Sequence, residues 1–167
     1  MTAATLSGLH HLKIFVFDLE ASLDWYQKVF GADHLQALDH LDSDGTRYAA
    51  IVSIPGVRVP VQLRWAPTAA NALRECDVIV LAVDSAEQLN GWIEHLDANE
   101  VEHSPVITGG GGAVVIIVDP DGKFIRLMVS PPGGVAAQTL PAAHLDPEGP
   151  WLNSAPMRHP RRPGRSR

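Results

Sequence analysis

The sequence predicts an α+β fold built from two tandem βαβββ modules. Two observations support this: the same order of strand-like and helix-like segments occurs twice, and the two copies keep a nearly constant offset. The equivalent first strands are 67 positions apart, from Leu12 to Ile79, and the equivalent last strands 64 apart, from Leu63 to Leu127. Internal duplication is the simplest explanation of such a repeat. The expected boundaries are a first module at residues 9–65, a second at 76–130 and a C-terminal extension at 131–167.

The first module opens with an apolar segment, residues 9–17, whose aromatic and branched side chains are typical of a strand. Apolar residues at helical spacing then predict an amphipathic helix over 22–30, with acidic residues near its start and Gly31 just past its end. The turn signals Asp44-Gly45 and Pro55-Gly56 separate three further strand-like segments. These segments are residues 34–41, 47–54 and 59–65.

The second module repeats this order. A strand is predicted over residues 77–83 and a helix over 85–98. Three more strands are predicted at 102–107, 113–118 and 124–129. Each module therefore has one helix between its first strand and the three later ones.

Composition and charge narrow the classes of function. The chain has 167 residues, of which 46% are hydrophobic and 19% charged, which is enough apolar material for a packed core. The net charge is −6, and residues 1–130 hold 8 basic and 17 acidic side chains. Nucleic-acid binding depends on clustered basic residues, so we expect no nucleic-acid partner.

Residues 131–167 differ from the rest of the chain. They contain 8 of the 13 prolines, together with five arginines and two acidic residues. Helix and strand interiors do not tolerate so much proline, so we expect an extended, basic tail.

The redox and targeting signals favour a cytoplasmic location. The single cysteine, Cys76, allows no intramolecular disulfide. The first residues lack the basic and apolar regions of a secretory signal, and no apolar stretch is long enough to cross a membrane. We expect no membrane partner.

Two sets of residues resemble a known family. The segment Leu9-His10-His11-Leu12-Lys13-Ile14-Phe15-Val16-Phe17-Asp18, running on to Val29-Phe30-Gly31, is similar to the opening of the glyoxalase/bleomycin-resistance/dioxygenase proteins, the vicinal oxygen chelate superfamily. In the second half, Cys76-Asp77-Val78, residues 100–105 and residues 118–122 match the same pattern. The resemblance implies concave mixed sheets with outer helices, and a homodimer. It does not imply one reaction, because the superfamily includes isomerases, dioxygenases, epoxide-opening enzymes and drug-sequestering binders.

The resemblance also implies a divalent metal held by His, Glu, His and Glu from four inward strand faces. The corresponding positions in this chain are His11, Gln62, Val78 and Arg126. An amide oxygen is a weak ligand, an alkyl group is none, and a guanidinium is a permanent cation. We therefore expect no metal or other cofactor here. One alternative stays open: a one-residue slip of the strand register would turn Asp77 inward in place of Val78 and give a non-standard metal site with His11.

Strand alternation predicts which side chains line the cavity. If His11 faces inward, Lys13 and Phe15 share its face, and His10 points away from it. The same rule directs Gln62 and Arg64 inward, and a third group lines the remaining wall: Val78, Val80, Phe124, Arg126 and Met128. The cations Lys13, Arg64 and Arg126 predict a pocket for a small anionic or conjugated molecule. Alternatively, these long side chains reach the rim and pair with Asp42, Asp44 or Glu75.

Three functions follow from these expectations. The first is metal-free binding of a small metabolite, for sequestration or biosynthesis. The second is a metal-independent enzyme of the isomerase or lyase type, in which His11 is a general base and a cation stabilises an enolate or phenolate. If the non-standard metal site exists, a glyoxalase-like or dioxygenase-like metalloenzyme takes the place of this second function. The third is an interaction subunit whose basic tail, from Arg158 onward, docks on an acidic partner or a second subunit.

Overall fold

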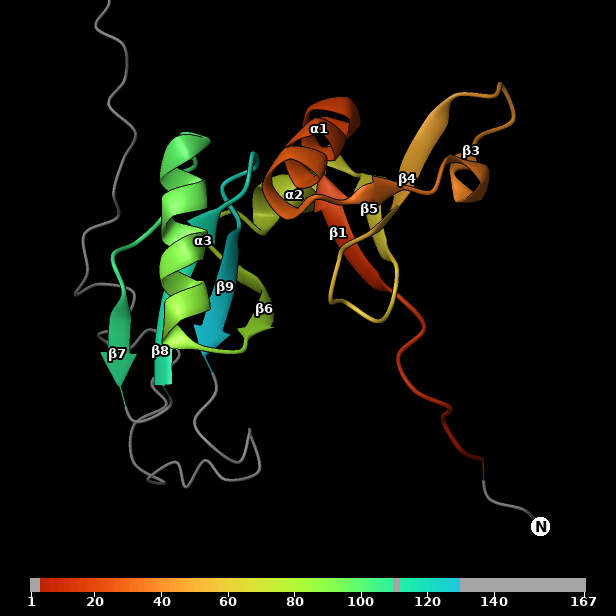
Figure 1. Cartoon of the computed structure of the whole chain (residues 1–167). Coiled ribbons are helices and arrows are strands. Elements are labelled where there is room, and N and C mark those ends of the chain that lie inside the picture. The colour runs from red at the N-terminus through yellow and green to blue at the C-terminus, as the bar shows by residue number, and fades with distance from the viewer. Residues whose placement is uncertain (1–3, 110–111, 130–167) are drawn as a thin grey trace, which may run out of the picture. The chain divides into compact units, whose positions relative to one another are not determined.

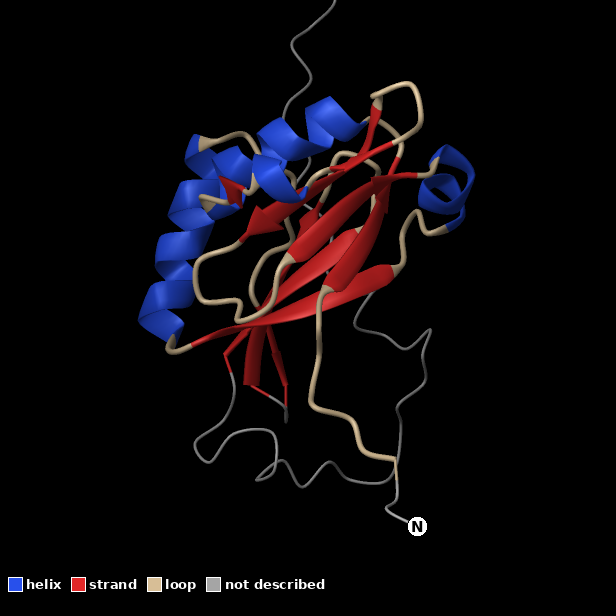
Figure 2. Ribbon diagram, turned by 90° about the vertical axis from the view of Figure 1, so that its right-hand side faces the viewer, coloured by secondary structure: helices blue, strands red, loops and turns tan. Residues whose placement is uncertain are grey.

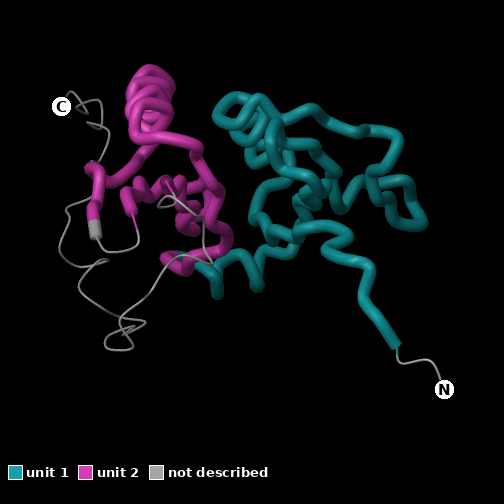
Figure 3. Tube along the Cα trace, turned by 60° about the horizontal axis from the view of Figure 1, so that its bottom comes forward, with its two compact units in different colours: residues 1–74 teal, residues 75–167 magenta. Residues whose placement is uncertain are grey.

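A computed structural model describes residues 4–109 and 112–129. The chain divides into two compact units, residues 1–74 and 75–167 (Figure 3). Each unit is a mixed sheet with its own helices. Figure 1 labels most of these elements, and Figure 2 colours them by type. The extension expected at 131–167 lies outside the described residues.

Unit 1 contains a five-stranded sheet in the order β1-β5-β4-β2, with β3 also paired to β4. The first strand runs parallel to the last, and the other pairs are antiparallel. The elements in chain order are β1 (Leu12–Val16), α1 (Leu19–Phe30), β2 (Asp33–His34), the 3-10 helix η1 (Gln36–Leu38), β3 (His40–Leu41), β4 (Arg47–Ser53), β5 (Val61–Trp65) and α2 (Pro67–Ala72).

Unit 2 contains a four-stranded sheet in the order β6-β9-β8-β7. Its first and last strands are again parallel, and its other pairs antiparallel. The elements are β6 (Asp77–Val83), α3 (Ala86–Ala98), β7 (Ile107–Gly109), β8 (Gly112–Val118) and β9 (Phe124–Val129). Both units therefore have the predicted βαβββ plan, and the α+β fold of tandem modules is confirmed.

Local sequence signals fix the ends of the two long helices. The Asp18 carboxylate accepts a hydrogen bond of 3.0 Å from the Ala21 amide, so α1 begins at Leu19, three residues earlier than predicted. Gly31 ends this helix in the left-handed conformation, at φ 60°. Ser85 caps α3 in the same way as Asp18 caps α1, through the Gln88 amide at 3.2 Å.

The core of each unit lies between one face of its sheet and the helices. In unit 1, α1 packs on β4 and β5, and in unit 2, α3 packs on the strands of its own sheet. The fully buried side chains include Val16, Val52 and Leu63 in unit 1 and Val115, Ile117, Ile125 and Leu127 in unit 2. Burial of these apolar groups is the main force that holds each module together.

Two predicted strands differ from the observed ones. Residues 34–41 form β2, η1 and β3 instead of one strand, because the Leu38 amide bonds the Leu35 carbonyl at 2.8 Å and turns the chain. The segment predicted over 102–107 reaches the ladder only at Ile107, apart from an isolated bridge at His103. There the Ser104 hydroxyl accepts the Ile116 amide at 2.9 Å in place of a backbone carbonyl, which interrupts the pairing.

Helix α2 is an addition that the sequence analysis missed. Among the described residues, every helix is too short or too polar to cross the hydrocarbon core of a bilayer.

Candidate functional site

One face of the unit 1 sheet carries four of the predicted site residues. Lys13 lies opposite Gln62 in the β1–β5 ladder, and Phe15 lies opposite Arg64. Residues that pair across a ladder share a face, so these four side chains lie on the same side of the sheet. The β4 partner of Gln62, Ile51, belongs to this face as well. The other face is buried beneath the helices.

A hollow of about 350 Å³ opens on this face, which is the size of a small-ligand pocket. Residues from the chain before β1, from η1, from three strands and from the turn before β5 form its walls. The lining residues are His10, His11, Leu38, His40, Ile51, Pro60 and Gln62. Two of the predicted residues, His11 and Gln62, are therefore brought together at one hollow.

Three imidazoles and one amide supply the polar groups of the hollow. Gln62 is only 2% exposed, and its Nε2 lies 3.1 Å from Nδ1 of His40. The Nδ1 atoms of His10 and His11 are 2.9 Å apart, so one ring donates a proton to the other. His10 was expected to point away from His11. That expectation is wrong because both residues precede β1, where strand alternation does not apply.

A β-bulge adds an aromatic ring to this face. In the β3–β4 ladder, His40 pairs with Ala49 and Leu41 pairs with Arg47, so Tyr48 is an extra residue without a partner. The Tyr48 ring makes an edge contact with His40, at 5.7 Å between centroids. The Arg64 guanidinium carbon lies 4.8 Å from the centroid of the same ring. A bulge breaks the period of two, so the sequence pattern could not show that Tyr48 belongs to the site.

The two cations of this face have no acidic partner. Within residues 4–109 and 112–129, neither Lys13 nor Arg64 forms an ion pair or a side-chain hydrogen bond. The surface acids that could have paired with them include Asp42, whose carboxylate instead accepts two backbone amides of its own turn. Arg64 therefore lies over the Tyr48 ring, and its N–H groups have no acceptor side chain within the described residues.

The third predicted cation is neutralised within unit 2. Arg126 donates from Nε and Nη2 to the two carboxylate oxygens of Asp77, at 2.8 and 2.7 Å. This two-point contact is the strongest common geometry for an arginine and a carboxylate. Arg126 thus has a protein carboxylate as its counterion, and its part in ligand binding stays a prediction.

The register of β6 explains how Asp77 reaches Arg126. Asp77 pairs with Phe124 and Ile79 pairs with Ile125, so Val78 is left without a partner in β9. The ladder then continues normally, with Val80 opposite Arg126 and Ala82 opposite Met128. The open face of unit 2 therefore carries Phe124, Arg126, Met128 and Val80 as predicted, but with Asp77 in place of Val78. Asp77 therefore lies on the face that the alternative register assigned to it. From Ile79 onward, the strand keeps the register that was predicted first.

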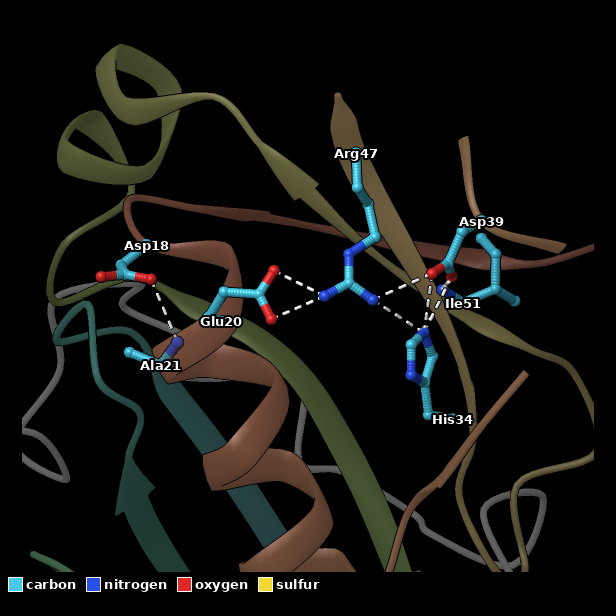
Figure 4. Close-up of polar contacts among 7 residues, drawn as sticks. All are labelled: Asp18, Glu20, Ala21, His34, Asp39, Arg47 and Ile51. Atoms are coloured by element: carbon cyan, nitrogen blue, oxygen red, sulfur yellow. Dashed lines mark hydrogen bonds and ion pairs between the residues drawn. The ribbon is translucent and has the colours of Figure 1, made fainter. Parts of the chain in front are cut away.

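A polar cluster borders the hollow of unit 1 (Figure 4). The Asp39 carboxylate contacts Nε2 of His34 at 2.8 and 2.9 Å and Nη1 of Arg47 at 3.0 Å, and it accepts the Ile51 amide at 3.1 Å. Arg47 also donates from Nη2 to both carboxylate oxygens of Glu20, at 2.5 and 2.6 Å. We call these four side chains, Glu20, His34, Asp39 and Arg47, the Asp39 cluster. The sequence analysis did not find it, because its members are up to 27 positions apart.

Burial and hydrogen bonding act in opposite directions on Asp39. Burial by itself would raise the pKa of the carboxyl group, but the hydrogen bonds from Arg47, His34 and the Ile51 amide outweigh it and lower the pKa. The hydrogen bonds to Glu20 and Asp39 raise the pKa of Arg47. Asp39 is therefore ionised at neutral pH, in a position where its side chain is only 6% exposed.

The donor set does not fit the divalent metal that the fold family implies. Of the four corresponding positions, His11 keeps a ligand, Gln62 is hydrogen-bonded to His40, Val78 has no donor atom and Arg126 is paired with Asp77. Within the part of the chain that the structure describes, no three His, Cys, Asp or Glu side chains converge as a metal site would require.

Comparison with known proteins agrees with the fold. The protein named "Putative ring-cleaving dioxygenase MhqA" from Bacillus subtilis (strain 168) is 26% identical over 136 residues, which are 77% of this chain and 42% of that protein. The chain thus spans about two fifths of the length of this curated relative.

Two solved structures have the same fold at low sequence identity. TnmS3, an antibiotic binding protein from Streptomyces sp. CB03234, has a TM-score of 0.62 and 23% identity, and the match covers 77% of this chain and 100% of that chain. A mutant of the fosfomycin resistance protein FosX from Listeria monocytogenes, complexed with Mn(II) and 1S,2S-dihydroxypropylphosphonic acid, has a TM-score of 0.60 and 20% identity, covering 76% and 95%.

The sequence itself matches a family model over most of the described residues. The matching model is that of the Glyoxalase/Bleomycin resistance protein/Dioxygenase superfamily, and the match extends over residues 8–127. This is more than half of the chain, and it includes both sheets. The chain belongs to the Glyoxalase/Bleomycin resistance protein/Dioxygenase superfamily.

Proposed function

We propose that this protein binds a small, anionic, conjugated molecule in the hollow of unit 1, without a metal ion. The observation that carries the proposal is the Arg64 guanidinium, which is stacked on Tyr48 and has no acidic partner among the described residues. A half-buried guanidinium needs a counterion, and a ligand carboxylate, phosphonate or phenolate would supply one.

The walls of the hollow suit a flat ligand body. Three imidazole rings, from His10, His11 and His40, line the hollow together with the apolar side chains of Leu38 and Ile51. The Tyr48 ring lies next to this wall, in edge contact with His40. Rings offer stacking surface to conjugated ligands, and Lys13 adds a second positive charge on the same face.

The known relatives include a protein named for antibiotic binding and one whose structure contains a phosphonic acid. These names support sequestration or a biosynthetic role, and we include in the proposal that the protein acts in the cytoplasm as a homodimer.

A ligand pair tests the charge requirement. Isothermal titration with aromatic carboxylates such as benzoate, salicylate and 2-naphthoate is compared with titration of the corresponding uncharged amides. We expect the carboxylates to bind at least about tenfold more tightly, since a charged hydrogen bond is worth about 1.5–3 kcal/mol. Binding is expected to be unchanged after treatment with a chelator. Equal affinity for acids and amides, or loss of binding on chelation, would contradict the proposal.

A variant pair locates the charge. Arg64→Gln is expected to lower carboxylate affinity about tenfold, because it removes the stacked cation. Lys28→Gln, which removes a charge from the last turn of α1, is the control for net charge and is expected to bind like the wild type. A similar loss in both variants would show that the effect is general electrostatics and not a site at Arg64.

A second candidate function is metal-independent acid–base catalysis with His11. The contact between the Nδ1 atoms of His10 and His11 favours it, because the ring that donates through Nδ1 keeps an unprotonated Nε2 when neutral. An imidazole in that state can accept a proton from a bound ligand. If this function is correct, His11→Ala removes turnover and keeps ligand binding. Equal turnover in both proteins would exclude His11 as the base.

A further inference from the structure

The segment from Leu38 to His40 forms one wall of the hollow, yet few backbone bonds hold it. Leu38 and His40 line the hollow, whereas the residue between them, Asp39, sends its side chain into the Asp39 cluster instead (Figure 4). The strand that contains His40, β3, has only two residues, and its ladder is interrupted by the bulge at Tyr48. The backbone ladder alone therefore fixes this wall weakly.

The Asp39 carboxylate connects the wall to its neighbours. It binds the amide of Ile51 in β4, a residue whose side chain also lines the hollow. It also binds His34 in β2 and Arg47 at the start of β4. One carboxylate, with a side chain only 6% exposed, thus joins three separate segments next to the ligand site, and each of its two oxygen atoms contacts two of these groups.

We infer that Asp39 is a positioning residue, whose carboxylate holds His40 in place for its hydrogen bond with Gln62 and so sets the ligand affinity of the hollow. The part that concerns affinity rests on the function proposed above. Nδ1 of His40 accepts a hydrogen bond from Nε2 of Gln62 at 3.1 Å, and the His40 ring contacts Tyr48, which lies beside Arg64. A displacement of residues 38–40 therefore moves the His40 ring relative to Gln62 and Tyr48. Through Tyr48 it also changes the surroundings of Arg64.

Glu20 provides a matched control. It is bound to the same Arg47 side chain, but it lies on α1 and its side chain is 68% exposed. It forms no hydrogen bond or ion pair with residues 38–40, all of which the structure describes. Glu20→Gln and Asp39→Asn each replace a carboxylate that binds Arg47 with the corresponding neutral amide. Only Asp39→Asn weakens the bonds that hold the wall.

The experiment compares Asp39→Asn and Glu20→Gln in the full-length chain with two readouts. The first is NMR of the protein without ligand, following the ring nitrogens of His40 and the side-chain amide of Gln62. The second is the dissociation constant of 2-naphthoate. We expect Asp39→Asn to shift the His40 and Gln62 signals and to weaken 2-naphthoate binding about tenfold, and Glu20→Gln to leave the signals in place and the affinity within about twofold of the wild type.

Several outcomes would overturn the inference. These are wild-type signals in Asp39→Asn, or equal changes in both variants. If Asp39→Asn does not fold, Asp39→Glu replaces it, because the added methylene displaces the carboxylate from the Ile51 amide and from His34. Unshifted His40 and Gln62 signals in Asp39→Glu overturn the inference as well. Failure of 2-naphthoate to bind the wild type would refute the proposed function, while the NMR comparison would still decide whether Asp39 positions His40.

Discussion

The two units share a plan but differ in the chemistry of their open faces. In both, the first strand pairs in parallel with the last, and a helix covers the other face of the sheet. The face of unit 1 has a hollow, and its cations Lys13 and Arg64 have no acidic partner among the described residues. On the face of unit 2, Arg126 is satisfied by Asp77, and the nearby Val80 is 55% exposed. The buried face sets the scaffold, and the open face is free to change.

The two units also differ in the direction in which the pKa of a buried carboxyl group is shifted. Asp39 of unit 1 accepts hydrogen bonds from three groups, and these lower its pKa. Asp119 of unit 2 has no exposed side-chain surface, and burial raises its pKa despite the hydrogen bond and charge of Lys123 at 2.9 Å. Lys123 is equally buried, so this pair belongs to the turn before β9 and not to an open face.

The largest effect is expected from a core change that tests whether the scaffolds are equivalent. Leu63 and Leu127 are corresponding residues of β5 and β9, and both are almost completely buried. Replacing either with Ala should lower the free energy of unfolding by about 2–5 kcal/mol, because it removes apolar contacts and leaves a cavity. Urea unfolding measures this. A loss below about 1 kcal/mol in one variant would show that its unit does not depend on the shared core.

The next largest effect is the contribution of the Asp39 carboxylate to the free energy of unfolding, which depends on pH. Because the folded-state pKa lies below the unfolded value of about 4, the ionised carboxylate stabilises the fold at neutral pH. This contribution is lost as the pH falls through the folded-state pKa. Asp39→Asn should therefore lower the unfolding free energy by about 1.5–3 kcal/mol at pH 7, and the gap to the wild type should narrow below about pH 4.

The control for this measurement is Glu20→Gln, whose exposed ion pair should contribute much less. Equilibrium unfolding at a series of pH values gives both curves. A gap that widens on acidification would mean that the pKa of Asp39 is raised and not lowered.

A smaller effect separates the two arginines. Arg64→Gln is expected to weaken binding of an aromatic carboxylate about tenfold, whereas Arg126→Gln should leave the affinity within about twofold, because its charge is already used by Asp77. Calorimetric titration of both variants makes the comparison. Equal losses would show that the anion site also depends on unit 2.

The smallest effect is expected at the Asp77–Arg126 pair itself. Asp77 is 36% exposed in its side chain, so Asp77→Asn should lower the unfolding free energy by no more than about 1 kcal/mol. The same variant leaves Arg126 without this carboxylate, and an aromatic carboxylate at high concentration should then stabilise Asp77→Asn more than it stabilises the wild type. Equal stabilisation of the two proteins would mean that Arg126 does not become available to anions.

The sequence predicted the repeated order of elements, and β6 and β9 begin and end at the predicted residues. Hydropathy patterns succeed there because each strand is a nearly continuous run of apolar residues, with Val83 of β6 and Ile125 and Leu127 of β9 buried. The site was predicted less well. Alternation placed Gln62 and Arg64 correctly on one face, but it could not foresee the extra residues Tyr48 and Val78, since a pattern of period two contains no signal for a bulge.

The Asp39 cluster was missed for a different reason. Its bonds join Glu20, His34 and Arg47 from separate segments, and no local pattern shows which distant polar groups meet after folding. His10 and His40 were misjudged or overlooked because each lies at the edge of a short strand, where the backbone turns and alternation ends.

The two bulges have a consequence for how such proteins diverge. In unit 1 the extra residue Tyr48 itself supplies the ring beside Arg64. In unit 2 the extra residue is Val78, and it shifts the register so that its neighbour Asp77 lies on the face of Arg126 and pairs with it. One inserted or deleted residue at such a point changes which side chain lies beside an arginine. Beyond the bulge of β6 the ladder continues in register from Ile79 to Val83, so the rest of the strand keeps its two faces.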